Sequence, residues 1–379
     1  MSRLRLTFVV ESGTDVRLVE GFADRFELTI IGREISSGVI ISQPPDAPIE
    51  LVTGPESRWR FGRFVRRELI RRSNQTDFIV VQGYGVAALA ANFAARQIRK
   101  RCMMLVCSPV EEYYIERKAR HFPGKPFRLR EIAALGVIAR INARVGQRYC
   151  VLSNHLGNTV RAHGTHLPVH VVPIYGVDTS RFRPSTLDVR VLRERAALPL
   201  NEPVIFFSSR VAPEKDSETL LASILMLRQS GRRVTVLHRS GGYRDFVRLA
   251  GEAGVEDQVI ATDAVRPGED LAGDYQASDI CVQASRAEGL GFSVLEALAC
   301  EIPVVASSTG GLKETIVDGV TGFTYPVGNA RMLADRIAYV LDHRMEALAA
   351  ARRGRQMVIE RFEANAVFDA FEKLVEPDA

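Results

Sequence analysis

Short runs of consecutive apolar residues alternate with longer amphipathic segments along nearly the whole chain. The runs predict buried strands, and the segments with apolar residues three or four positions apart predict helices packed on one face. The predicted strands are residues 4–10, 26–31, 39–42, 78–81, 103–107, 149–153, 169–172, 204–210, 234–238, 259–261, 279–282 and 303–306. The predicted helices are residues 16–25, 86–96, 154–163, 217–229, 270–277, 330–341, 346–353 and 356–375. This alternation favours an α/β protein with parallel, doubly wound sheets.

The stretch from Ser285 to Cys300 concentrates the candidate chemistry. Glu288 and Glu296 stand eight positions apart, on either side of the turn Gly289-Leu290-Gly291. A strand, a glycine turn and a helix in this order leave the first helical N–H groups unpaired, and such a helix end favours an anion. A carboxylate oxygen accepts two hydrogen bonds, which suits sugar hydroxyls. The alternative is that one glutamate only occupies a turn and the other favours the helix dipole.

Flanking motifs extend this pattern. The spacing from Glu288 to Glu296, Pro303-Val-Val-Ala306, Gly310-Gly311 and Gly319-x-x-Gly322-Phe323 resemble the C-terminal half of the GT-B glycosyltransferases. The resemblance is closest to the large retaining family 4 with its E-x7-E signature. Residues 173–178 with Phe182 and Pro184 resemble the phrase that closes the first domain of that family. Arg210 and Pro213-Glu214-Lys215 resemble its basic phrase ahead of a helix.

The resemblance implies a fold and a domain division. It implies the GT-B fold, in which two Rossmann-like, doubly wound parallel-sheet domains face a cleft. The acceptor-binding domain would comprise residues 1–182, and the domain that binds the nucleotide-sugar donor would comprise residues 183–354. Residues 355–379 would form a helix that crosses back to the first domain.

The resemblance also implies roles for individual residues. Glu288 would bind the hydroxyls of the donor sugar, and Glu296 would bind the ribose of the nucleotide. Arg210 and Lys215 would neutralise the diphosphate, because an arginine fork and a lysine charge both suit phosphate. Together with Glu288 they would carry catalysis by front-face attack with retention, and no metal or other cofactor would be required. The remaining donor contacts would come from Gly291, Phe292, Ser293, Gly310 and Gly311.

The acceptor side departs from the family pattern. Cys107-Ser108-Pro109 stands where the family usually has a histidine after the corresponding strand. The remaining acceptor candidates, by position alone, are Gly13, Ser108, Glu111, Glu112 and Tyr113. Residues 116–130 are polar and basic and are predicted to form a mobile lid or an acceptor loop. His238 is interpreted as a core histidine, with an approach to the donor base as the alternative.

Composition limits the class of protein. A chain of 379 residues with 46% hydrophobic and 25% charged residues has the size and composition of a two-domain globular protein. No apolar run approaches the roughly 18 residues of a membrane span, and residues 4–10 are too short for a secretory signal. The five cysteines lack metal-ligand spacing, so reduced thiols and a cytoplasmic location are expected.

The charge is unevenly distributed. Residues 1–180 contain 26 Lys and Arg against 16 Asp and Glu, a net charge of +10; residues 181–379 contain 24 against 29, a net charge of −5. Seven arginines between positions 58 and 72 alternate with Trp59 and other apolar residues. This pattern is typical of a helix that lies on an anionic membrane. A solvated helix face is the alternative, and no nucleic-acid motif accompanies the patch.

Taken together, the sequence predicts a retaining glycosyltransferase. It would transfer a hexosyl unit from a nucleotide-diphosphate sugar, with a UDP-sugar favoured and GDP-mannose as the other option, to a hydroxyl acceptor in glycan biosynthesis. A lipid-linked acceptor at the inner face of the cell membrane would fit the basic stretch. Three alternatives stay open: a non-catalytic sugar-nucleotide-binding subunit of a polysaccharide assembly complex, a GT-B nucleotide-sugar epimerase, and a protein that binds membranes or nucleic acids through its basic half.

Overall fold

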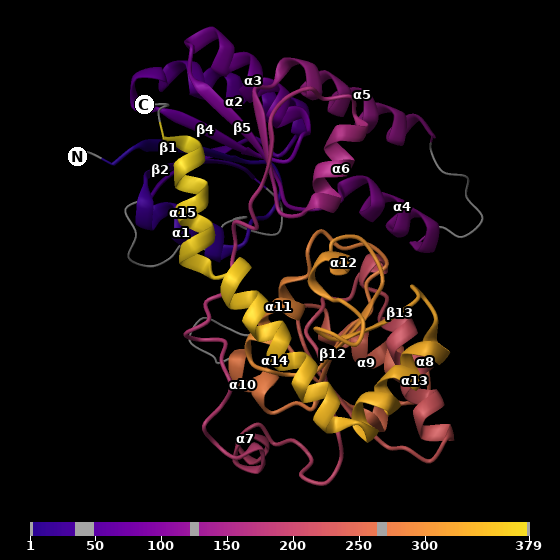
Figure 1. Ribbon diagram of the computed structural model, residues 1–379. Helices are drawn as coiled ribbons and strands as arrows, with labels where there is room; N and C mark the ends of the chain where they lie inside the picture. Colours follow the sequence, from indigo (N-terminus) through magenta and orange to yellow (C-terminus); the bar gives the residue numbers. More distant parts are fainter. Residues whose placement is uncertain (1–2, 35–48, 122–128, 264–270, 377–379) are drawn as a thin grey trace. The chain divides into compact units, whose positions relative to one another are not determined.

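The structure is a computed structural model that describes residues 3–34, 49–121, 129–263 and 271–376 (Figure 1). It contains two sheets, and every pair of neighbouring strands in them is parallel. The strand orders are β3-β2-β1-β4-β5-β6-β7 and β10-β9-β8-β11-β12-β13. Both orders reverse direction next to their first strand, as in Rossmann-like domains. The predicted fold class, two doubly wound parallel-sheet domains, is therefore confirmed.

The elements follow each other in the predicted alternation. The strands are β1 Arg5–Val10, β2 Glu27–Arg33, β3 Glu50–Gly54, β4 Phe78–Gln82, β5 Arg101–Val106, β6 Arg148–Val151, β7 Val169–Val171, β8 Val204–Phe207, β9 Thr235–Arg239, β10 Val259–Thr262, β11 Ile280–Gln283, β12 Val304–Ser307 and β13 Phe323–Tyr325. The α-helices are α1 Val16–Arg25, α2 Arg58–Arg71, α3 Val86–Ile98, α4 Val110–His121, α5 Leu129–Val145, α6 Asn154–Ala162, α7 Val189–Arg195, α8 Ser217–Gln229, α9 Tyr243–Glu252, α10 Leu271–Gln276, α11 Phe292–Ala299, α12 Leu312–Thr315, α13 Ala330–Asp342, α14 Arg344–Arg361 and α15 Ala364–Val375. Short 3-10 turns occupy Ser73–Gln75, Pro213–Lys215 and Glu256–Gln258.

The chain divides into two compact units. Unit 1 comprises Met1–Glu111, Pro126–Tyr175 and Asn365–Ala379, and unit 2 comprises Glu112–Lys125 and Gly176–Ala364. The division therefore falls after Tyr175, before the predicted boundary at Phe182. The physical reason is that Val177 exchanges backbone hydrogen bonds with residues 362 and 364, while Phe182 packs edge-on against Tyr275, and all of these residues belong to unit 2.

Unit 1 is completed by the last helix of the chain. In α15, Phe368 and Phe371 pack against Phe22 of α1, with ring centroids 6.1 and 5.2 Å apart. Gly21 gives Phe368 room, because a Cβ at position 21 would lie 2.0 Å from the end of that ring. Of the last two described helices, α15 returns to unit 1, whereas α14 packs on α11 in unit 2. The crossing segment is thus shorter than the predicted residues 355–379.

Other differences concern segments between the strongest hydrophobic runs. The predicted strand at residues 39–42 and most of the predicted loop after residue 121 lie outside the described residues. β3 and α5 were not predicted, and residues 116–121 are helical as the end of α4 rather than a loop. None of the described helices is both long and apolar enough to cross a membrane.

Candidate active site

The candidate site lies at the carboxyl ends of β8 and β11, which are neighbours in the second sheet. The chain leaves β8 toward β9 on one side and leaves β11 toward β12 on the other, so this is the position where the strand order reverses. Ligands of open α/β sheets bind at such switch points. The topology therefore brings the basic segment after β8 to the same place as the glutamate turn after β11.

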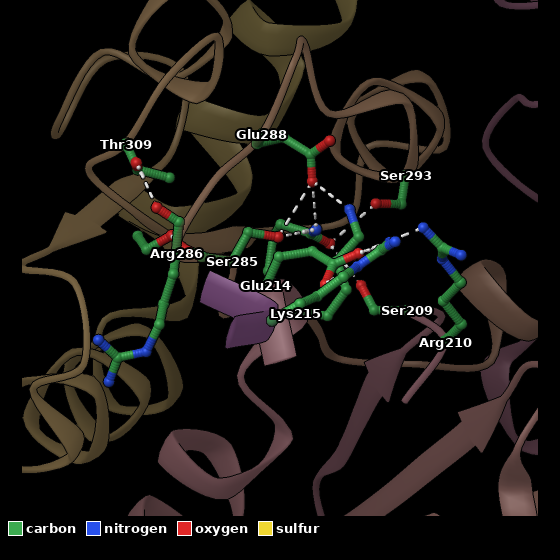
Figure 2. Close-up of polar contacts among 12 residues, drawn as sticks. Ser209, Arg210, Glu214, Lys215, Ser285, Arg286, Glu288, Ser293 and Thr309 are labelled. Carbon is green, nitrogen blue, oxygen red and sulfur yellow. Dashed lines mark hydrogen bonds and ion pairs between the residues drawn. The ribbon is translucent and has the colours of Figure 1, made fainter. Parts of the chain in front are cut away.

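Glu288 is held from one side of its carboxylate. Its Oε2 accepts hydrogen bonds from Lys215 Nζ at 2.6 Å, Gln283 Nε2 at 3.0 Å and Ser285 Oγ at 3.0 Å. Figure 2 shows these three contacts converging on one oxygen, while the other oxygen, Oε1, points away from them. Only 8% of Glu288 is exposed. The carboxylate is therefore fixed in orientation, and Oε1 keeps its lone pairs for a further donor such as a hydroxyl.

Gln283 connects the parts of this network. Its Nε2 also donates to Ser285 Oγ at 2.8 Å, and its Oε1 accepts from Ser209 Oγ at 3.2 Å and Ser293 Oγ at 2.9 Å. The amide orientation is determined by Glu288, because a carboxylate can only accept and must face the NH₂ group. Gln283 thus joins β11, the segment after β8 and the start of α11. Nothing in the sequence distinguished it from an ordinary residue at a strand end.

A loop after β12 clamps the backbone of the glutamate turn. The hydroxyls of Ser307 and Thr309 donate to the carbonyls of Ser285 and Arg286, and the Gly311 N–H donates to the Glu288 carbonyl at 2.9 Å. These bonds fix the position of the turn.

The paired glycines of this loop allow its close approach. A Cβ at Gly310 would lie 2.2 Å from the Glu288 carbonyl oxygen, and one at Gly311 would lie 2.1 Å from the Gly289 oxygen. Both glycines therefore support the turn through backbone contacts. That they also contact a donor remains a prediction.

The start of α11 fits the predicted anion site. Gly291 is its N-cap residue with φ +94°, and no side chain caps the helix. Ser293 is in the first turn, while Glu296 follows in the second turn and is 6% exposed. Tyr275 donates its hydroxyl to Glu296 Oε2 at 2.8 Å. Burial and the neighbouring Glu296 raise the pKa of Tyr275 well above its ordinary value, so this hydroxyl stays a hydrogen-bond donor.

Arg210 and Lys215 face different carboxylates. Lys215 is bound to Glu288, and Arg210 lies 3.3 Å from Glu214 with 57% of its side chain exposed. Glu214 is fully buried, and Arg117 of α4 holds it through two hydrogen bonds of 2.5 and 3.0 Å. Burial alone would raise the pKa of Glu214, but the hydrogen bond and charge of Arg117 bring it below the ordinary value. Because Arg117 contacts both oxygens of Glu214 at shorter distances, Arg210 is the weaker of the two partners of this carboxylate.

A second group of ion pairs holds α4 in unit 2. Arg120 contacts Asp216 at 2.8 Å and Glu218 at 2.5 Å, and Arg286 contacts Asp216 at 2.8 Å. Asp216 is fully buried and caps the start of α8 through Thr219. Sequence reasoning missed Arg117 and Arg120 because their partners lie about a hundred positions away, and no local pattern signals such a pairing.

Two of the acceptor candidates, Tyr113 and Glu111, have defined side-chain contacts. The Lys215 ammonium lies 5.9 Å from the ring centroid of Tyr113, and burial together with the charges of Glu288 and Glu214 raises the pKa of Tyr113. Glu111, which belongs to unit 1, contacts His163 Nε2 at 2.8 Å. The structure thus places Tyr113 next to the predicted donor residues and pairs Glu111 with a histidine that the sequence did not single out.

The other acceptor candidates have fewer defined contacts. Gly13 and Ser108 follow the carboxyl ends of β1 and β5, so they lie at the same edge of the first sheet. Glu112 begins the part of α4 that belongs to unit 2. Their role in binding an acceptor remains a prediction. Among residues 3–34, 49–121, 129–263 and 271–376, no group of three or more His, Cys, Asp or Glu side chains could hold a metal ion.

His238 is a core residue, as interpreted from the sequence. It is fully buried and stacks on Phe246 with ring centroids 4.0 Å apart. Its Nδ1 lies 2.9 Å from the Phe207 carbonyl oxygen, which can only accept, so Nδ1 carries the proton. Burial lowers the pKa of His238 to about 4, and the imidazole is therefore neutral at pH 7.

Comparison with known proteins relates the second half of the chain to glycosyltransferases. Residues 188–357 match the family Glycosyl transferases group 1. The chain is 35% identical over 204 residues to a D-inositol 3-phosphate glycosyltransferase of Xylanimonas cellulosilytica, covering 51% of this chain and 48% of the relative. It is 33% identical over 207 residues to a GDP-mannose-dependent alpha-(1-6)-phosphatidylinositol monomannoside mannosyltransferase of Mycolicibacterium smegmatis, covering 51% and 52%. The chain thus spans about half the length of the curated relatives it matches.

A solved structure resembles the whole chain. The crystal structure of Anabaena HepE in complex with UDP and glucose superposes with a TM-score of 0.77 at 18% sequence identity, covering 98% of this chain and 99% of HepE. At this identity the likeness shows the fold, which is the two-domain GT-B fold.

Proposed function

We propose that this chain, whose residues 188–357 form a Glycosyl transferases group 1 domain, is a retaining glycosyltransferase that transfers a hexosyl unit from a nucleotide-diphosphate sugar to a hydroxyl acceptor. The observation that carries the proposal is the one-sided anchoring of Glu288. Three donors hold Oε2, and Oε1 is left for a sugar hydroxyl. A carboxylate held through both of its oxygens would have less capacity to accept from a ligand hydroxyl.

Departure of the nucleoside diphosphate places negative charge on its phosphates. In the proposed mechanism Arg210 leaves Glu214 and contacts the diphosphate, while Lys215 lies between Glu288 and the leaving group. The uncapped N-terminus of α11 adds its N–H groups and dipole. Charge stabilisation of this kind, with substrate positioning, lowers the barrier without a protein nucleophile. The bond between the anomeric carbon and the diphosphate breaks, and the acceptor hydroxyl attacks that carbon from the same face. The hydroxyl proton passes to an oxygen of the departing diphosphate, and the anomeric configuration is retained.

The donor is proposed to be a UDP-sugar, with GDP-mannose as the other option. HepE binds UDP and glucose, and one relative is named for GDP-mannose, so both donors occur among similar proteins. Glu296 would accept from the ribose of either nucleotide. The two cations at the diphosphate position support a reaction that needs no metal, and the acceptor is proposed to be a hydroxyl of a glycan or glycoconjugate.

Nucleotide binding is the first test. The protein is titrated with UDP, GDP, ADP, TDP and their sugar conjugates while its thermal unfolding is followed. A ligand present at a hundred times its Kd adds about 2.7 kcal/mol to the free energy of unfolding. We expect stabilisation by one nucleobase series, and absence of stabilisation by every nucleotide would contradict the proposal.

Turnover separates the transferase from its alternatives. With the stabilising nucleotide sugar and candidate acceptors, a transferase releases nucleoside diphosphate and forms a product of the same anomeric configuration. An epimerase would change the sugar without releasing the nucleotide, and a non-catalytic subunit would bind without either. Glu288→Ala should abolish transfer, whereas Glu68→Ala, which removes a similarly buried, arginine-paired glutamate in unit 1, should not. Transfer by Glu288→Ala at the wild-type rate would exclude the site assignment.

A further inference from the structure

Helix α2 of unit 1 presents a surface that the proposed reaction does not use. Its buried side consists of Phe61, Gly62, Val65, Glu68 and Leu69. The opposite side, here termed the arginine face, is exposed and consists of Arg58, Trp59, Arg60, Arg63, Arg66, Arg67 and Arg71. An amphipathic helix normally places mixed charges toward water, but this face carries positive charge alone.

The positive charge of the arginine face is only partly neutralised. The one acidic residue of α2, Glu68, is 6% exposed, and its carboxylate lies 2.6 Å from Arg71 and 3.8 Å from Arg67. Within the described ranges, neither Arg60 nor Arg63 has an acidic partner, and Arg66 donates only to the neutral Gln97 of α3 at 2.9 Å. The surface therefore has unpaired cationic groups that an anionic partner would complement.

The arginine face contains a hollow of about 360 Å³. It is lined by Arg63, Arg66, Arg67 and Ile70. A hollow lined by three arginines and one isoleucine suits a phosphate attached to an apolar body, because the fork geometry of arginine matches phosphate oxygens.

Trp59 completes the pattern. Trp59 is 67% exposed, and positions 59, 63, 66 and 70 follow one stripe of the helix. An indole ring exposed beside cations is expensive in water but favourable in the headgroup region of a bilayer. Nucleic acid would satisfy the arginines, but a bilayer interface also takes up Trp59 and Ile70.

We propose that the arginine face of α2 docks on an anionic lipid surface, with Trp59 among the headgroups and a lipid phosphate in the hollow. The contact is peripheral, since only one side of one helix is involved. It does not depend on the proposed glycosyl transfer, so either can fail without the other.

The chain carries its own probe for the test. Trp59 is its single tryptophan, so tryptophan fluorescence excited at wavelengths where tyrosine does not absorb reports on the arginine face alone. The protein is titrated with phosphatidylcholine vesicles and with vesicles that also contain phosphatidylglycerol. We expect a shift of emission to shorter wavelength and quenching by brominated acyl chains with the anionic vesicles only, and both should weaken as salt screens the charges.

Variants localise the contact. Arg63→Glu/Arg66→Glu/Arg67→Glu should weaken binding to the anionic vesicles at least about 100-fold, because each basic residue near such a surface contributes about fivefold. The matched control Arg183→Glu/Arg190→Glu/Arg195→Glu makes the same charge change at exposed arginines of unit 2 and should keep most of the binding. Trp59→Ala should weaken vesicle binding without changing the net charge. Because this variant lacks the fluorescent probe, its binding is measured by vesicle sedimentation. Circular dichroism confirms that each variant is folded.

Several results would overturn the proposal. One is unchanged Trp59 emission with anionic vesicles at low salt. Another is an equal response to inositol phosphates or inorganic phosphate in solution without any vesicle binding, which would indicate a site for free phosphate. A third is tighter binding and a larger spectral change with transfer RNA than with vesicles, which would indicate a nucleic-acid surface. Equal loss of vesicle binding in both triple variants would show that net charge, rather than α2, is responsible.

Discussion

Replacing Gln283 by methionine would remove the polar centre of the glutamate network while keeping the length of the side chain. Gln283 is 2% exposed and donates to Glu288 Oε2 at 3.0 Å, so the substitution withdraws one of the three donors that orient the carboxylate. It also releases the hydroxyls of Ser209 and Ser293, which donate to its Oε1. Lys215 and Ser285 would still donate to Glu288, but the donor from β11 would be lost.

The size of the effect follows from the bond that is lost. A hydrogen bond to a charged group contributes about 1.5–3 kcal/mol. If that energy orients Glu288 for the sugar, affinity for the nucleotide sugar should fall by roughly 10- to 100-fold, at 1.4 kcal/mol per factor of ten. Affinity for the nucleoside diphosphate alone should change little, because Glu288 does not contact the nucleotide in the proposed mechanism.

The assay is calorimetric titration with a nucleoside diphosphate and with its sugar conjugate. The quantity of interest is the ratio of the two Kd values in the wild type and in Gln283→Met. Gln258→Met is the matched control, since Gln258 is also fully buried and donates to the carbonyl of Val234 at 2.7 Å, outside the network. It should cost similar stability and leave the ratio unchanged.

An unchanged ratio of the two Kd values in Gln283→Met would refute the positioning role, whether neither affinity changes or both weaken equally. A change of the ratio in Gln258→Met would show that general loosening of unit 2 is responsible. If the wild type bound no nucleotide at all, the proposed function would fail before the role of Gln283 was reached.

Three further predictions concern stability. The pKa of His238 is about 6.5 in the unfolded chain and about 4 in the folded protein, so unfolding takes up a proton between these pH values. The free energy of unfolding, measured by urea titration, should therefore fall by about 2 kcal/mol from pH 7.5 to pH 5. His238→Phe should lack this pH-dependent loss. Gly311→Ala would force the loop away from the Gly289 oxygen and should cost roughly 1–3 kcal/mol, measured by chemical denaturation. Arg117→Ala removes the closest cation from the buried Glu214 carboxylate. Because Arg117 is 48% exposed, we expect the free energy of unfolding to fall by only about 1–3 kcal/mol. Adding Glu214→Gln should restore part of that stability, and no recovery would contradict the ion-pair explanation.

Much of the fold could be predicted because local patterns determine it. Short apolar runs such as residues 78–81 and 280–282 indicate buried strands. Their alternation with helices requires crossover connections, which make the sheets parallel. Segments with a weaker pattern were missed. β3, of which only Gly54 is buried, is an edge strand of the first sheet. The second half of α4 carries so many charges that it was predicted to be a loop.

The candidate site was predictable in part for the same reason. The glycine turn and the helix that follows it are local properties of the chain. The positive φ of Gly291 agrees with that expectation. The meaning of the spacing from Glu288 to Glu296 came from the resemblance to the glycosyltransferases. Arg210 and Lys215 could be placed near them only through the resemblance, since the two segments are far apart along the chain.

The sequence by itself determined the two parallel-sheet domains and the residue types near the second switch point. The tertiary structure decided how these residues are used. It showed that Glu288 is anchored through one oxygen, that Gln283 joins three segments, and that Arg117 of α4 neutralises Glu214. The physical reason is that strand and helix periodicity depend on neighbours in the chain. Hydrogen bonds and ion pairs depend on neighbours in space, which exist only after the β-strands have paired.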